Sequence, residues 1–166
     1  MVFLFVPYFS NAQLFKKRKQ AKAAAEAARQ ARAAQPRLAP GQFEWHPERA
    51  SAGPLLVVVS IDNQLAYVYR NGVQIARSTV STGAPGHETP TGVFTVLQKN
   101  KDHESNIYKG AKMPNMQRLT WSGIAMHAGD LPGYPASHGC IRLPLEFSDK
   151  LFSITEMGCT VVVTKE

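Results

Sequence analysis

Short β-branched runs that begin near residue 55 constrain most strongly how this chain can fold. Residues 55–61 are almost wholly apolar, which is typical of a buried strand, and residues 64–70 alternate apolar and polar side chains. Asn71-Gly72 follows, and this dipeptide predicts a two-residue hairpin because both turn positions favour positive φ. Further strands are predicted over residues 73–80, 93–97, 124–127 and 160–164. Short strands separated by turns predict a mainly β, sandwich-like domain.

One helix and one long loop complete this expectation. Residues 145–155 predict a helix, with Pro144 at its first turn and Gly158 just past its end. Residues 99–112 are polar and irregular, so we expect a long loop of the kind that often covers a site. The whole domain is expected over residues 54–166.

The residues before this domain have a different composition. Residues 2–9 are apolar and lead into Ser10-Asn11-Ala12, which resembles the end of a secretory signal. We expect residues 1–12 to form a signal segment and the chain to be exported. The alternative is an apolar N-terminus that packs on the domain. We interpret residues 13–40 as a basic, alanine-rich helical tail and residues 41–53 as a linker.

The excess positive charge is confined to this tail. Its eight Lys and Arg side chains and its single Glu account for the whole net charge of +7. This argues against nucleic acid as a partner, since a nucleic-acid-binding domain carries basic residues across one face. Two alternatives stay open for the tail: a solvated spacer, or an electrostatic tether to an anionic cell-envelope surface. No apolar run approaches the roughly 20 residues of a membrane-spanning helix.

The chemistry of the chain is concentrated in one short segment. His127 is followed by Ser137-His138-Gly139-Cys140, which contains one of only 2 cysteines. A thiol is a useful nucleophile as a thiolate, which a nearby histidine can generate. The N–H groups of Gly139 and Cys140 could donate to an oxyanion. Two histidines and a cysteine are also three potential zinc ligands, and a buried structural cysteine is a third alternative. Spacing alone leaves all three open.

This segment resembles the signature of the L,D-transpeptidase catalytic domain, the YkuD-like family: a histidine, a gap, and then Ser/Thr-His-Gly-Cys. The similarity extends over roughly residues 54–164 and includes Thr82-Gly83, the 89–94 loop and strand, and Met113-Pro114. Two departures stand out. The gap between His127 and Ser137 is shorter than the common form, and Arg142 stands where asparagine is common. They affect the shape expected for the lid rather than the chemistry.

The resemblance implies a cysteine acyltransferase, without cofactor or metal, that acts on peptidoglycan stem peptides in the cell envelope. Cys140 matches the nucleophile and His127 the general base, which a backbone carbonyl orients in such enzymes. The thioester then passes to an amine, which cross-links the wall or attaches a protein. With water as the acceptor, the same residues make an L,D-carboxypeptidase or amidase. A non-catalytic wall-binding module is the alternative of another class, and the complete motif argues against it.

Supporting roles follow for the neighbours of the nucleophile. If the motif is extended, His138 shares a face with the thiol, so it either tunes the thiol or holds the loop. Ser137 and Gly139 are expected to support the oxyanion site. Arg142 is expected either to bind a substrate carboxylate through its planar fork or to form a surface ion pair. Tyr134 lies in the gap of the motif and is expected to line the cleft.

Three further residues are not assigned to the site. Cys159 precedes an apolar strand and is expected to be a free, buried small hydrophobe. His87 and His103 stand alone in loop-like sequence, and we expect both to be solvated.

Overall fold

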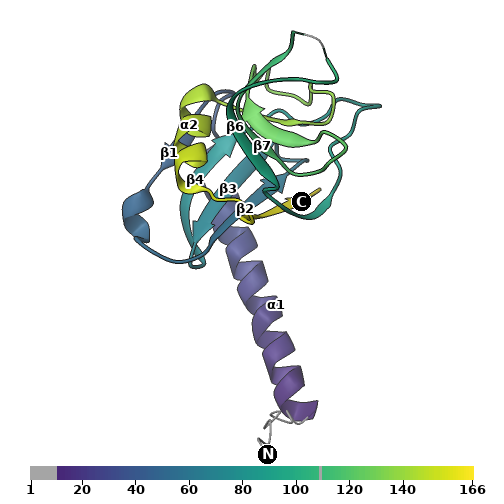
Figure 1. Ribbon diagram of the computed structural model, residues 1–166. Coiled ribbons are helices and arrows are strands. Elements are labelled where there is room, and N and C mark those ends of the chain that lie inside the picture. The colour runs from purple at the N-terminus through teal and green to yellow at the C-terminus, as the bar shows by residue number, and fades with distance from the viewer. Residues whose placement is uncertain (1–10, 109) are drawn as a thin grey trace, which may run out of the picture. The chain divides into compact units, whose positions relative to one another are not determined.

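The computed structural model describes residues 11–108 and 110–166 (Figure 1). The chain divides into two compact units, Met1–Arg37 and Leu38–Glu166. Within the first unit, helix α1 spans Asn11–Ala33, and all of its side chains that the structure describes are exposed. Alanine and straight-chain residues favour this helix, and it has no wide apolar stripe. None of the helices in the described part of the chain is long and apolar enough to cross a membrane.

The second unit contains a six-stranded sheet. Its strands are β1 (Phe43–Trp45), β4 (Val73–Thr79), β3 (Leu65–Arg70), β2 (Leu55–Ser60), β10 (Thr160–Thr164) and β5 (Gly92–Thr95), in that spatial order. The β3–β4 hairpin turns at Asn71 and Gly72, which have φ of 48° and 78°, as its sequence predicts. All neighbouring strands are antiparallel except β10 and β2, which run parallel.

A four-stranded sheet forms the other layer of this unit. It contains β6 (Gln98–Glu104), β7 (Lys112–Arg118), β8 (Ala125–Ala128) and β9 (Ile141–Leu143), in that order. The first two pairings are antiparallel, and β8 and β9 run parallel. This parallel pair places the two ends of the sequence motif beside each other, because the motif's histidine lies on β8 and its cysteine directly precedes β9.

The main core lies between the two sheets and helix α2 (Leu145–Ile154). Val57, Val68 and Val161 from the larger sheet pack in one cluster with Met126 and Ile141 from the smaller sheet. The α2 side chain Phe147 is fully buried in this cluster, and the rings of Phe43 and Trp45 each lie 5.6 Å from its ring. The site therefore rests on a packed double layer.

Most predicted elements are present, and the mainly β, sandwich-like fold class is confirmed. The prediction of an irregular loop over residues 99–112 is wrong in its first half, because β6 occupies Gln98–Glu104. The predicted linker contributes β1 and the short 3-10 helix η1 (Pro47–Arg49), and β1 pairs with β4. Residues 1–10 of the predicted signal segment lie outside the described residues.

Candidate active site

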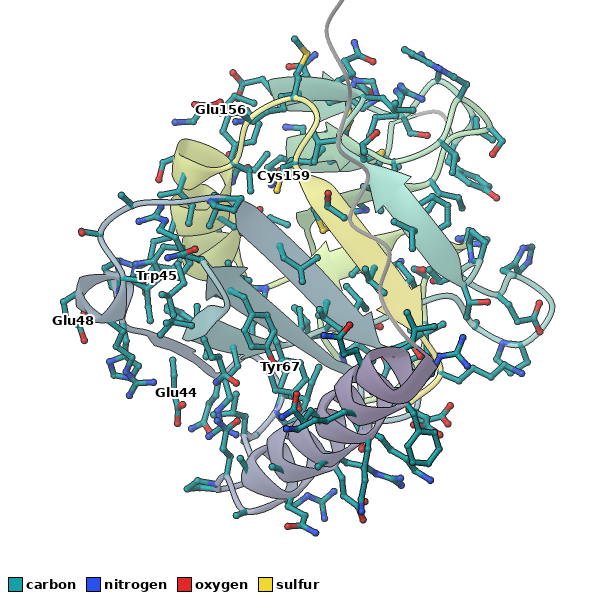
Figure 2. All side chains as sticks on the ribbon, turned by 90° about the horizontal axis from the view of Figure 1, so that it is seen from below. Glu44, Trp45, Glu48, Tyr67, Glu156 and Cys159 are labelled. Atoms are coloured by element: carbon teal, nitrogen blue, oxygen red, sulfur yellow. The ribbon has the colours of Figure 1, made fainter. Side chains whose placement is uncertain are left out.

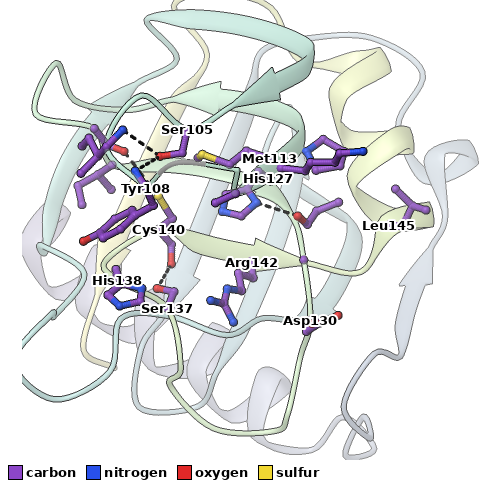
Figure 3. A pocket seen from close by; sticks show the side chains of 18 of the residues that line it. Ser105, Tyr108, Met113, His127, Asp130, Ser137, His138, Cys140, Arg142 and Leu145 are labelled. Atoms are coloured by element: carbon purple, nitrogen blue, oxygen red, sulfur yellow. Dashed lines mark hydrogen bonds between the residues drawn. The ribbon is translucent and has the colours of Figure 1, made fainter.

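The register of the parallel pair places Cys140 and His127 on the same face. Met126 lies opposite Ile141, and His127 lies opposite Arg142. Because side chains alternate along a strand, Met126 and Ile141 enter the core, while His127 and Arg142 face the other side with Cys140. All three line one cavity of about 760 Å³ (Figure 3). Register thus brings together residues that are thirteen positions apart in the sequence.

His127 is held in a single tautomer. Its Nδ1 lies 2.7 Å from the carbonyl oxygen of Ala128, and because a carbonyl only accepts, Nδ1 carries the proton. The neutral ring therefore has its lone pair on Nε2. Burial lowers the pKa of His127, the Ala128 bond raises it, and the charges of Arg142 and His103 lower it further. The net direction is down, so the ring is a neutral base at neutral pH.

The Cys140 thiol is half-buried and protonated at rest. Its Sγ lies 3.5 Å from the carbonyl oxygen of Gly123 and donates to it. Burial raises the pKa of Cys140, and this outweighs the backbone hydrogen bond of Ala125 and the charges of Arg142 and Arg118, which lower it. The thiol and the imidazole are therefore both neutral at rest, so a thiolate at Cys140 would have to be generated by proton transfer.

A buried hydroxyl holds the turn before Cys140. The Thr89 Oγ1 donates to the Gly139 carbonyl at 2.8 Å and accepts from the Gly83 N–H at 2.9 Å. Ser137 acts from inside the turn, since its Oγ accepts from the Gly139 N–H at 3.1 Å and donates to the Cys140 carbonyl. Gly139 has φ of 109°, a region that favours glycine, and a Cβ there would lie 2.8 Å from an Ile124 methyl.

These bonds decide which N–H can serve an oxyanion. The Gly139 carbonyl and the Cys140 N–H belong to one trans peptide group and point in opposite directions. Anchoring the carbonyl on Thr89 therefore directs the Cys140 N–H away from Thr89, and that N–H takes part in none of the bonds named above. The Gly139 N–H, which we also expected to be a donor, is already bonded to Ser137.

Three aromatic rings cluster at the cavity, which His138 and Tyr108 line, and sequence reasoning did not link the other two rings to His138. The exposed His138 ring packs 4.8 Å from His87 and 4.6 Å from Tyr108. His87 comes from the 81–89 loop and Tyr108 from the connection between β6 and β7, so no local pattern links them to the motif. His87 is exposed, as we expected, but it is not isolated, because its ring packs against His138. The hydrogen bonds near Tyr108 are drawn in Figure 3.

Two other expected residues have contrasting positions. Arg142 lines the cavity, as does the neighbouring Asp130. Tyr134 does not line it: its side chain is 62% exposed, and its backbone carbonyl accepts from the Ser81 hydroxyl at 2.8 Å. The 129–136 loop is thus fixed through its backbone, and the Tyr134 ring is left facing solvent.

The second cysteine belongs to another part of the domain. Cys159 directly precedes β10 (Figure 2) and is free and half-buried. It lines a separate cavity with Arg70 and Glu156, and burial raises its pKa. Within residues 11–108 and 110–166, no group of three or more His, Cys, Asp or Glu side chains is arranged to hold a metal ion.

Comparison with known proteins agrees with this geometry. A family model described as the L,D-transpeptidase catalytic domain (YkuD) matches residues 54–163. An L,D-transpeptidase from Stackebrandtia nassauensis is 29% identical over 69% of this chain and 57% of its own, with a TM-score of 0.62. One from Mycobacterium tuberculosis H37Rv is 25% identical over 66% of this chain and 57% of its own, also with a TM-score of 0.62.

A third similar structure holds a ligand. It is an LD transpeptidase in complex with imipenem, 25% identical over 66% of this chain and 58% of its own, with a TM-score of 0.61. This chain thus spans less than two thirds of the length of each of these three structures. None of the curated protein sequences matches it.

Proposed function

This chain belongs to the L,D-transpeptidase catalytic domain family, and on that premise we propose that it is a cysteine acyltransferase acting on peptidoglycan stem peptides. One observation carries the proposal: Cys140 and His127 share a face of adjacent parallel strands in one cavity, and Ala128 holds the His127 ring with Nε2 free. The neutral resting pair suits a mechanism in which the base acts as the substrate arrives.

The first half-reaction forms a thioester. His127 Nε2 takes the thiol proton as the Cys140 Sγ attacks the donor carbonyl on the L-centre of the third stem residue. The tetrahedral oxyanion accepts a hydrogen bond from the Cys140 N–H. The scissile C–N bond then breaks, and the imidazolium returns its proton to the leaving amine, which departs as the terminal D-Ala.

The second half-reaction uses the same groups in reverse order. An acceptor amine attacks the thioester carbonyl, and His127 removes a proton from the attacking nitrogen. The carbon–sulfur bond breaks, a new amide bond remains, and the Cys140 thiolate regains its proton from His127. The product is a cross-link between stems or a protein attached to the wall.

Mass spectrometry of the purified chain with a stem tetrapeptide and a second stem as acceptor tests this function. We expect the acyl-enzyme mass on the peptide that contains Cys140, a cross-linked product, and neither signal in Cys140→Ser. If the products contain a hydrolysed tripeptide and no cross-link, water is the acceptor, and the chain is an L,D-carboxypeptidase rather than a transpeptidase. Binding without any acyl-enzyme in folded protein would contradict the enzyme reading and favour a wall-binding module.

A carbapenem supplies an independent test of the nucleophile. A similar L,D-transpeptidase has been solved with imipenem, and a strained β-lactam carbonyl can acylate the same thiol. We expect one imipenem mass per chain, located at Cys140 and absent in Cys140→Ala. An unmodified wild type would argue against an accessible, activated thiol.

The basic N-terminal segment is proposed as a tether to an anionic surface of the cell envelope, where we place the enzyme. Helix α1 carries exposed basic side chains such as Lys16, Arg18 and Lys19. Deleting residues 1–37 is expected to leave the acylation rate unchanged and to weaken sedimentation with isolated sacculi at low salt, where screening is least. Salt-independent binding with and without the segment would make it a spacer.

A further inference from the structure

Arg142 places an unpaired positive charge in the cavity that contains the nucleophile. The side chain is half-buried and lines the cavity with Cys140 and His127 (Figure 3). Among the residues that the structure describes, none forms a hydrogen bond or ion pair with its guanidinium. Asp130 lines the same cavity and makes no ion pair with it. The surface ion pair considered from the sequence is therefore not formed.

The position of Arg142 is fixed from two sides. Its backbone N–H donates to the Ser81 carbonyl at 2.9 Å, and its carbonyl accepts from the Ser81 N–H at 3.0 Å, while β9 pairs with β8 on the other side. Its stem packs on the backbone of Gly129, where a Cβ would lie 3.1 Å from both Cγ and Cδ. These contacts fix the backbone and the stem of Arg142, and none of them uses an N–H donor of its guanidinium.

The spacing matches a carboxylate near the scissile bond. Cys140 and Arg142 are two positions apart on one face, which in extended chain separates their Cα atoms by about 6.6 Å. When Cys140 attacks a carbonyl of the donor peptide, the guanidinium of Arg142 therefore lies near a group of that peptide roughly one residue away from the attacked carbonyl. Its five donors in a planar fork bind a carboxylate bidentately.

We propose that Arg142 binds a free carboxylate of the donor peptide and makes the enzyme select donors that carry it. This deepens the proposed function and rests on it. Two groups of a stem tetrapeptide have this chemistry: the terminal carboxylate of the leaving residue, and a side-chain carboxylate on the third residue. Amidation of one of them removes the negative charge and one acceptor, so a donor amidated at the recognised position loses the fork contact.

The experiment compares three synthetic tetrapeptides: the free acid, the terminal carboxamide and the side-chain carboxamide. We expect wild type to be acylated about 10- to 100-fold faster by the free acid than by one of the two amides, which identifies the recognised group. Arg142→Gln should lose this advantage and treat all three donors alike. Arg142→Lys, which keeps the charge without the fork, should retain part of it.

Arg118→Gln is the matched control for charge alone. Arg118 also lowers the pKa of Cys140, but it donates to Gln98 and does not line the cavity. We expect this variant to keep the full discrimination between donors. Three results would overturn the inference. Wild type could be acylated at one rate by all three donors, Arg142→Gln could still discriminate between them, or Arg142→Gln and Arg118→Gln could slow acylation by every donor equally.

Binding to Cys140→Ala separates this inference from the proposed function. Calorimetry measures the affinity of Cys140→Ala for each of the three peptides, and this variant cannot form a thioester. One outcome would separate the two proposals. Wild type would never be acylated, Cys140→Ala would bind the free acid more tightly than an amide, and the double variant Cys140→Ala/Arg142→Gln would lose this preference. The acyltransferase proposal would then fail, and carboxylate recognition by Arg142 would stand. Equal affinity of Cys140→Ala for all three peptides overturns the role of Arg142.

Discussion

Thr89→Val removes one hydroxyl on which the geometry of the turn before Cys140 depends. Thr89 is 4% exposed, and its Oγ1 bridges the Gly139 carbonyl at 2.8 Å and the Gly83 N–H at 2.9 Å. Valine has nearly the same shape and offers neither a donor nor an acceptor. Both backbone groups are buried, so water cannot easily replace the lost partner.

The expected loss of stability follows from these two orphaned groups. Each buried polar group left without a partner costs about 1–3 kcal/mol. The extra methyl that valine buries returns about 0.8 kcal/mol. We therefore expect Thr89→Val to lower the free energy of unfolding by about 1–5 kcal/mol. Thr89→Ser keeps the hydroxyl and loses a methyl, so its expected loss is about 1 kcal/mol.

The same change should slow acylation. Without Thr89 the Gly139 carbonyl is released, and the Cys140 N–H in the same peptide group turns with it. Complete loss of an oxyanion donor costs about 10²–10³ in rate, and a misdirected donor is expected to cost roughly 10- to 100-fold.

Urea unfolding and the rate of carbapenem acylation measure the two effects. We expect Thr89→Ser to lose only about 1 kcal/mol and to be acylated at the wild-type rate, whereas Thr89→Val falls in both measurements. If the two variants unfold within about 0.5 kcal/mol of each other and are acylated at the same rate, the hydroxyl does not hold the turn. A loss of stability without a loss of rate would limit Thr89 to the fold.

Three further predictions concern separate groups. Cys140→Ala should abolish acylation while Cys159→Ser retains it, as intact-protein mass shows; activity lost with Cys159 in folded protein would contradict the assignment. Because burial lowers the pKa of His127 below its ordinary value of 6.5, the acidic limb of the acylation rate should lie below pH 6.5 and vanish in His127→Gln; a limb above that pH would indicate another base. Lys99→Met removes two hydrogen bonds to carbonyls at the end of α2, at 2.7 and 2.6 Å, and should cost about 1–3 kcal/mol in urea unfolding, whereas Lys101→Met, exposed on the same strand, should not.

The elements that the sequence predicts well are those specified by local chemistry. The Asn71-Gly72 turn and the apolar β2 need no distant partner to be recognised. By contrast, β6 reads Gln-Lys-Asn-Lys-Asp-His-Glu, and only Lys99 and His103 on it are partly buried. It is an edge strand, so pairing with β7 rather than an apolar face stabilises it, and no hydrophobic alternation reveals it.

The site divides in the same way. His127 and Cys140 could be found from the motif, because each residue type carries its own chemistry. The bond between Thr89 and Gly139 joins residues fifty positions apart, and the contact of His87 with His138 depends on how the 81–89 loop folds over the motif. Such contacts depend on tertiary packing, which spacing along the chain does not encode.

The last strand of the domain occupies an interior position in its larger sheet. β10 lies between β2 and β5 and pairs with both. Until residues 160–164 have emerged, β5 therefore has no partner in this sheet, and β2 is paired on one side only, with β3. Until then β2, Leu-Leu-Val-Val-Val-Ser, presents an unpaired apolar edge of the kind that recruits other chains. Folding of this domain is therefore completed only after residues 160–164 have emerged, and truncation before residue 160 should yield aggregates rather than a smaller soluble domain.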